Sequence, residues 1–292
     1  MRSPVLFALM LVLGAGGSLL PAPSAAQSAR ATRAQAEASM VLTGTIDISP
    51  TGSVEAFTLR DEAKVDAYLQ EFVRKNVAQW RFEPVMRDGV AVPARTPVNL
   101  RLVASKTEEK GMQVELRSAS FRAYDSSATD DVVYEKMTPP RYPSDVFQRN
   151  GAGEVLLLIQ VGRDGSVANV AAEQVNLYMV GLPKEMERTR DRLAKVSIDA
   201  ARRWTFRPPT TGELVDEHSW TVRVPVTFRI SYDGGIPDTY GRWQAYIPGP
   251  RQKPSWDVGS AADDASADAL PEGGVYMAGI DKGPRLLTPL GG

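Results

Sequence analysis

Few side-chain patterns in this chain of 292 residues could catalyse a reaction, and none has the spacing that catalysis requires. The chain has no cysteine and a single histidine, which excludes thiol catalysis, thiolate metal sites and a cluster of imidazole ligands. That histidine, His218, lies between Glu217 and Ser219, but neighbours on a strand point to opposite faces and do not converge as a catalytic triad must. We therefore interpret His218 as a polar residue at the start of a strand.

Other patterns that could hold a ligand are better explained by structure. The stretch Gly151-Ala152-Gly153 precedes a strand signal, and no Lys-Ser or Lys-Thr pair follows it, so it is not a phosphate-binding loop. Asp130-Asp131 and Asp263-Asp264 are adjacent acids in polar segments, where solvated charge is expected and not a metal site. The sequence thus predicts no enzyme, no metal site and no small-molecule cofactor.

Charge and the N-terminal segment bear on partners and location. The formal net charge is -1, which argues against a nucleic-acid binder, because such proteins normally carry a basic face. Arg2, the apolar residues 5–20 and Ser24-Ala25-Ala26 form the pattern of a cleaved signal peptide over residues 1–26. The prediction is a periplasmic protein. An uncleaved inner-membrane anchor is the alternative, although the run is short for a span of about 20 apolar residues.

One pattern occurs twice along the chain. Trp80-Arg81-Phe82-Glu83-Pro84 and Trp204-Thr205-Phe206-Arg207-Pro208 each follow an amphipathic helical stretch. Each stretch follows a strand–turn–strand signal, with its turn at Gly52 in the first copy and at Asp164-Gly165 in the second. Each copy ends in a strand opened by Pro-Val, at Pro97 and Pro225. Anchors that recur in one order indicate an internal duplication.

The first unit is predicted over residues 40–104. Strands are expected at residues 42–48 and 53–59, followed by a helix with Asp61 as its N-cap. Val65, Leu69, Val73 and Trp80 mark one apolar stripe of that helix. After a turn at residues 88–89, residues 97–103 return as the closing strand.

The second unit is predicted over residues 112–231. It begins with an additional strand at residues 112–121, and residues 155–161 and 167–175 then pair as a hairpin. A helix at residues 184–204 and a closing strand at residues 219–231 complete it. The fold class is α+β, in which each unit is a small antiparallel sheet of a hairpin plus a closing strand, covered by one helix.

The last residues, 232–292, have a different composition. They are rich in Gly, Pro, Asp and Ala, and their aromatic residues follow neither helical nor alternating spacing. Such a segment cannot bury enough apolar surface to offset its chain entropy. We therefore predict a mostly disordered C-terminal tail.

The second unit carries a set of motif residues in one order: Tyr142, Pro143, Gly153, Asp164, Gly165, Trp204, Phe206, Pro208 and the closing Val224-Pro225-Val226 with Phe228. With these residues it resembles the C-terminal domain of the TonB energy-transducer family. The first unit matches only from Gly44 onward and keeps Trp80, Phe82 and Pro84, so it is interpreted as a degenerate copy. Independently of the resemblance, we expect the Trp-x-Phe-x-Pro residues to be structural. The aromatic residues would be buried in the core and the proline would end the helical stretch, which is a better explanation than contact with a ligand.

The resemblance implies a site for a protein partner on the closing strand. Members of this family capture a short segment of outer-membrane receptors there, and an edge strand binds an extended peptide through its main-chain groups. Carried onto this chain, the partner-binding residues are Trp220, Thr221, Val222, Arg223, Val224, Thr227 and Arg229. The even-numbered residues of this strand are expected to face the core. Pro225 removes one donor and would weaken binding if its nitrogen faced the free edge.

The leading hypothesis is a non-catalytic periplasmic module that binds an extended peptide of an envelope or outer-membrane protein. A membrane-anchored TonB-type transducer, or an accessory to one, is the second. The apolar run lacks the His of the family's membrane helix, and no long Pro-rich spacer precedes the first unit, which makes force transduction doubtful. The third is an envelope scaffold whose units pair edge to edge, within one chain or in a homodimer.

Overall fold

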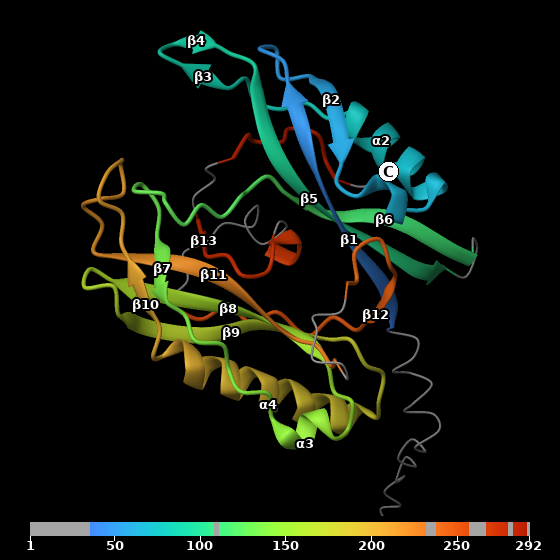
Figure 1. Cartoon of the computed structure of the whole chain (residues 1–292), viewed down its shortest axis with the longest axis vertical. Helices are drawn as coiled ribbons and strands as arrows, with labels where there is room; N and C mark the ends of the chain where they lie inside the picture. The colour runs from blue at the N-terminus through green and yellow to red at the C-terminus, as the bar shows by residue number, and fades with distance from the viewer. Residues whose placement is uncertain (1–35, 108–110, 232–237, 257–266, 280–282, 291–292) are drawn as a thin grey trace, which may run out of the picture.

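The α+β class predicted from the sequence is confirmed. The structure, a computed structural model, describes residues 36–107, 111–231, 238–256, 267–279 and 283–290. The predicted signal peptide, residues 1–26, lies outside them. Two antiparallel sheets, each with one long helix, make up most of the described chain (Figure 1).

The first unit is built on a long central strand. The hairpin strands are β1 (Glu37–Ile48) and β2 (Val54–Leu59), and the closing strand is β5 (Ala94–Thr107), which pairs with β1 over its length. The covering helix is α2 (Ala67–Ala78), preceded by the short η1 (Glu62–Lys64). A small hairpin, β3 (Met86–Arg87) and β4 (Val90–Ala91), surrounds the predicted turn at residues 88–89. On the far side of β5 lies β6 (Gly111–Ser120).

The second unit repeats this topology. β8 (Gly153–Gly162) pairs with β9 (Val167–Leu177) and with the closing strand β11 (Ser219–Phe228). The helix α4 (Pro183–Ala201) packs on this sheet. The shorter elements are β7 (Val133–Lys136), α3 (Ser144–Phe147) and β10 (Thr205–Arg207), and β10 pairs with β7. The strand order β9-β8-β11 corresponds to β2-β1-β5 of the first unit.

Matching hydrogen bonds fix the repeated Trp-x-Phe motif in both units. The amide of Phe82 donates to the carbonyl of Gly52 at 2.7 Å, and the amide of Phe206 donates to the carbonyl of Gly165 at 2.9 Å. Both glycines have positive φ, +80° and +77°. A Cβ on either would lie 2.0 Å from the carbonyl oxygen of the phenylalanine. The hairpin turn therefore needs glycine both for its conformation and for its close contact with the strand that follows the helix.

The two cores lie between each helix and its sheet. Leu69, Val73 and Val77 of α2 pack on Leu42 and Leu100 in the first unit. In the second unit, Leu193 and Ala200 of α4 pack on the apolar face of β8 and β11. Trp80 and Trp204 are each 3% exposed. The predicted core role of these tryptophans agrees with their burial.

Two sequence-based boundaries were wrong. Asp61 does not cap the long helix: its φ is +46° and it precedes η1, whereas Asp66 caps α2 by accepting the amide of Tyr68 at 2.9 Å. Residues 112–121 do form a strand, but β6 pairs with β5 and belongs to the sheet of the first unit.

The described parts of the C-terminal segment are ordered, which corrects the prediction of a mostly disordered tail. β12 (Gln244–Tyr246) pairs with β1, and β13 (Tyr276–Met277) pairs with β11, with η2 (Ala267–Ala269) between them in the chain. Tyr246, Ile247, Val275, Tyr276 and Met277 are at most 3% exposed. Their burial against the two units supplies the apolar contact that composition alone did not reveal.

The two sheets face one another. Figure 1 shows α2 on the outer face of the first sheet and α4 on the outer face of the second, with the C-terminal segments between the sheets. Within one chain the described strands of the two units do not pair edge to edge, because β6, β12 and β13 pair with the edges of β5, β1 and β11 instead. Pairing between two chains stays a prediction.

The turn glycines give a stability test. We expect Gly165→Ala and Gly52→Ala each to lower the free energy of unfolding by roughly 3 kcal/mol or more, because strain at positive φ adds to a clash with backbone. Gly89→Ala is the matched control, since Gly89 has φ +77° but a Cβ at this position would meet no atom within 4 Å. It should cost about 1 kcal/mol. Equal losses in urea denaturation would contradict the docking role of the two turns.

The second tryptophan gives another test. Trp204 is buried and its indole nitrogen donates to the carbonyl of Thr138 at 2.8 Å. Trp204→Ala should cost roughly 3–5 kcal/mol of unfolding free energy. Trp243, 38% exposed, is the control, and Trp243→Ala should cost less than about 1 kcal/mol. A loss for Trp204→Ala no larger than that of the control would refute its place in the core.

Candidate functional site

The closing strand β11 has the predicted alternation of faces. Val222, Val224 and Phe228 lie in the core beneath α4. Trp220 is in the same core, 4% exposed, and its indole nitrogen donates to the carbonyl of Leu214 at 3.0 Å. The side chains predicted at Trp220, Val222 and Val224 for partner binding are therefore buried and cannot contact a partner.

On the opposite face of β11, Arg223 is held in a buried ion pair. Its guanidinium donates to both carboxylate oxygens of Glu173, at 2.7 and 3.1 Å, and both side chains are 3% exposed. Glu173 reaches this face because the pairing of β9 with β8 is irregular at this point, between the pairs at Gln174 and Ala172. Arg223 therefore serves the packing of the sheet and is not available to a partner.

Further ionic contacts lie between the two sheets. Arg251 lies 3.8 Å from Glu173 and 3.2 Å from Asp268, and Arg101 of β5 donates to the carbonyl of Asp268 at 2.5 Å. Arg101 is also 3.7 Å from Glu154 on β8. These contacts join β5, β8, β9, β11 and the C-terminal segment at the interface of the two units.

Burial shapes the ionisation of Glu154. It raises the pKa of this carboxyl group above its usual value, against the opposing effects of Arg101 and of a hydrogen bond from Tyr178. The Tyr178 hydroxyl donates to Glu154 at 2.9 Å, and burial raises the pKa of Tyr178 well above its usual value. The hydroxyl therefore stays protonated and remains a donor.

The free edge of β11 is already paired in part. Val222 pairs with Met277 and Arg223 with Tyr276 of β13, and the amide of Ala278 donates to the carbonyl of Thr221 at 2.8 Å. The sequence-based expectation of an open edge is therefore wrong at Thr221, Val222 and Arg223. The edge accepts an antiparallel strand, and that strand is the chain's own.

The same bond shows which way Pro225 faces. In an antiparallel strand the main-chain groups of alternate residues point to the same side. Because the carbonyl of Thr221 points to the outer edge, the main-chain groups of Arg223 and Pro225 do so as well. The missing donor of Pro225 thus lies on the edge, and the part of β11 before Pro225 is the better place for an added strand.

The remaining predicted binding residues lie towards the end of the closing strand. Arg229 forms an ion pair with Glu272, which comes just before β13 in the chain. The hydroxyl of Thr227 is buried and has no hydrogen-bond partner among the described residues. Neither residue is engaged by β13 itself, since β13 pairs only with Val222 and Arg223.

The other motif residues have structural contacts. Tyr142 donates to the carbonyl of Gly151 at 2.6 Å, and burial raises its pKa to about 12. A Cβ at Gly153 would lie only 2.4 Å from the carbonyl oxygen of Asn176, so a larger residue would clash with the backbone there. Asp164 accepts the amide of Ser166 at 3.0 Å in the hairpin turn. Pro143 caps α3, while Pro208 is half-buried and Pro84 exposed.

Two further searches concern only the described parts of the chain. Within them no group of three or more His, Asp or Glu side chains is placed to hold a metal ion. Neither α2, α4 nor a shorter helix there has the length and apolarity that a membrane span requires.

Comparison with known proteins gives a partial match. Over 107 residues, 37% of its length, the chain is 34% identical to Protein TonB from two strains of Xanthomonas campestris pv. campestris. The match covers 42% of those proteins, so the chain spans less than half the length of the curated relatives it matches. The solution structure of the Pseudomonas aeruginosa TonB C-terminal domain is 20% identical, over 38% of this chain and 97% of that domain, with a TM-score of 0.25. No family model matches the chain.

The buried ion pair yields a prediction. Glu173→Gln removes the carboxylate charge that pairs with the buried guanidinium of Arg223, which should cost roughly 3 kcal/mol or more of unfolding free energy. Asp145→Asn is the control, because its pair with Arg192 is 3.1 Å long but 40% and 44% exposed. That substitution should cost less than about 1 kcal/mol in the same denaturation experiment. Similar small losses for both would show that the Glu173 pair does not stabilise the interface.

Proposed function

We propose that this chain, which carries a unit of the TonB C-terminal-like family, is a non-catalytic periplasmic module that binds an extended segment of an envelope or outer-membrane transport protein. The segment would add to the sheet of the second unit as an antiparallel strand on β11. The observation that supports this most directly is β13, because a segment from outside the unit already pairs with this edge. The edge thus has the geometry that strand addition requires.

The contacts of β13 indicate what a guest strand would need. Val275 and Met277 join the core beneath α4, whereas Tyr276 between them donates its hydroxyl to the carbonyl of Pro271 on the other side. A guest would therefore need aliphatic residues at alternate positions and an amide to donate to Thr221. Pro225 offers no amide donor on this edge. We therefore expect the guest to pair with residues 219–223 and not with the residues that follow them.

A guest must compete with the chain's own strand. An intramolecular segment acts at an effective concentration on the order of millimolar, so a free peptide of equal intrinsic affinity displaces it poorly. However, β13 has only two paired residues, and a net main-chain hydrogen bond contributes about 1 kcal/mol. A longer guest, or one presented at high local concentration, can therefore replace it.

The scaffold is the second candidate function, and the same strand favours it. If β13 stays on β11 permanently, the edge is closed and the two units form a structural element of the envelope. A membrane-anchored transducer and a homodimer are further alternatives. The N-terminal residues that would anchor a transducer lie outside the described part of the chain. Binding of a peptide to β11 separates the first function from the scaffold.

The experiment uses the protein's own strand as a probe. A labelled peptide of residues 270–279 is titrated into the purified protein and into Ala278→Pro, which lacks the amide that bonds Thr221. Loss of that bond should release β13, so the variant should bind the peptide about tenfold more tightly than the unchanged protein does. Fluorescence anisotropy measures both affinities.

The control is the same peptide with proline at the position of Ala278. It should bind neither protein, because it cannot donate to Thr221.

Envelope extract passed over both immobilised proteins should then yield more of any strand-adding partner on Ala278→Pro. If a folded Ala278→Pro protein binds no peptide, β11 is not a docking edge and the scaffold function stands.

A further inference from the structure

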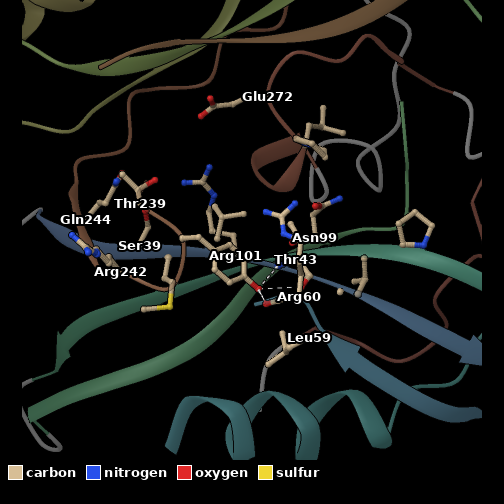
Figure 2. A pocket seen from close by; sticks show the side chains of 18 of the residues that line it. Ser39, Thr43, Leu59, Arg60, Asn99, Arg101, Thr239, Arg242, Gln244 and Glu272 are labelled. Atoms are coloured by element: carbon tan, nitrogen blue, oxygen red, sulfur yellow. Dashed lines mark hydrogen bonds between the residues drawn. The ribbon is translucent and has the colours of Figure 1, made fainter. Parts of the chain in front are cut away.

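A cleft of about 860 Å³ lies between the two units. Its floor is the face of the first sheet that points away from α2, and its walls include Tyr178 and Arg229 of the second unit and two pieces of the C-terminal segment. Figure 2 shows Ser39, Thr43, Asn99 and Arg101 on the floor, with Glu272 on the opposite side. Clefts of this size between units are common places for small ligands.

The ionisable residues of the cleft are unbalanced. Five arginines line it, against three carboxylates, Glu154, Asp238 and Glu272. Arg101 is paired with Glu154, and Arg229 with Glu272. Arg60 and Arg242, by contrast, have no carboxylate within ion-pair distance among the described residues, although Arg60 stacks on the ring of Tyr240 and Asp238 attracts Arg242 from farther away. Two guanidinium groups therefore retain their charge-binding capacity at the cleft.

The floor also carries polar groups without protein partners. Ser39 is 4% exposed and Asn99 5% exposed, and neither side chain forms a hydrogen bond with the described residues. The hydroxyl of Thr43 and the Nε of Arg229 are fully buried and likewise unpartnered there. Buried polar groups normally have partners, so several beside one cleft indicate a place where a ligand supplies them.

We propose that this cleft binds a small hydroxylated anion, with its carboxylate or phosphate groups on Arg60 and Arg242 and its hydroxyls over Ser39, Thr43 and Asn99. Arginine suits such a ligand because its planar fork donates two parallel hydrogen bonds to a carboxylate or phosphate. The neutral groups of the floor can donate to and accept from hydroxyls. The residues that would hold the anion lie outside β11, so the proposal does not rest on peptide binding there.

Citrate and glucose 6-phosphate are the probes, titrated into the purified full chain by calorimetry at constant ionic strength. Glucose, which lacks the charge, is the neutral control ligand. At least one anion should bind saturably, and glucose should bind at least about tenfold more weakly. Citrate and glucose 6-phosphate together show whether carboxylate or phosphate is preferred.

Variants locate the binding. Arg242→Ala should weaken it about tenfold, and Asn99→Asp, which places a negative charge on the floor, should weaken it further. Arg87→Ala is the matched control, because Arg87 is an exposed arginine in the β3–β4 hairpin and should leave affinity unchanged. Thermal unfolding verifies that each variant is folded. No saturable binding of either anion below about 10 mM, or equal affinity of Arg242→Ala and Arg87→Ala, would overturn the proposal.

Discussion

Each small sheet must bury two faces, although its unit has only one long helix. On β8, Val155, Leu157 and Ile159 face α4. Leu156 and Leu158 alternate with them and point to the opposite face, yet they are 2% and 0% exposed. The unit contains no element of its own to cover that face. The sheet of the first unit and the C-terminal segments supply the cover, so the two units and the tail form one packed structure.

The same requirement accounts for the charges between the sheets. Arg101, Glu154, Glu173 and Arg223 lie on inward faces where an apolar residue would also fit, and each has a partner of opposite charge. Taking such groups out of water costs energy that the pairing roughly offsets. We interpret their role as alignment, because a shifted arrangement of the two sheets would leave several of these charges buried without partners.

Local sequence signals predicted the units well and their surroundings poorly. The glycine turns, the Trp-x-Phe pairs and the alternation along β11 depend on neighbours close in sequence, and the structure agrees with them. The alternating residues of β6 indicated a strand, but alternation does not say which strand it pairs with. β13 has two paired residues, too few for any periodicity. Glu173 reaches the interface because the pairing of β9 with β8 is irregular there, and no residue type in the sequence predicts that irregularity.

The equivalent edges of the two units are closed very differently. In the first unit, β6 covers the closing strand β5 over nine pairs and is the next strand along the chain, so its removal would disrupt the sheet. In the second unit, β13 covers β11 over two pairs and belongs to a distant part of the chain. Removal of β13 from β11 therefore breaks fewer strand pairs than removal of β6 from β5, so β11 is the edge that opens at the lower free-energy cost.

The cleft and that edge share a segment of the chain. Leu270, Pro271 and Glu272 line the cleft and lead directly into β13, and Glu272 holds Arg229. An anion that replaces Glu272 on Arg229 would loosen the attachment of β13 and lower the cost of seating a guest on β11. Linkage is reciprocal, so a guest that displaces β13 would then raise the affinity of the cleft for the anion by the same factor. An anion that bound without disturbing Glu272 would leave the two sites independent, however tightly it bound.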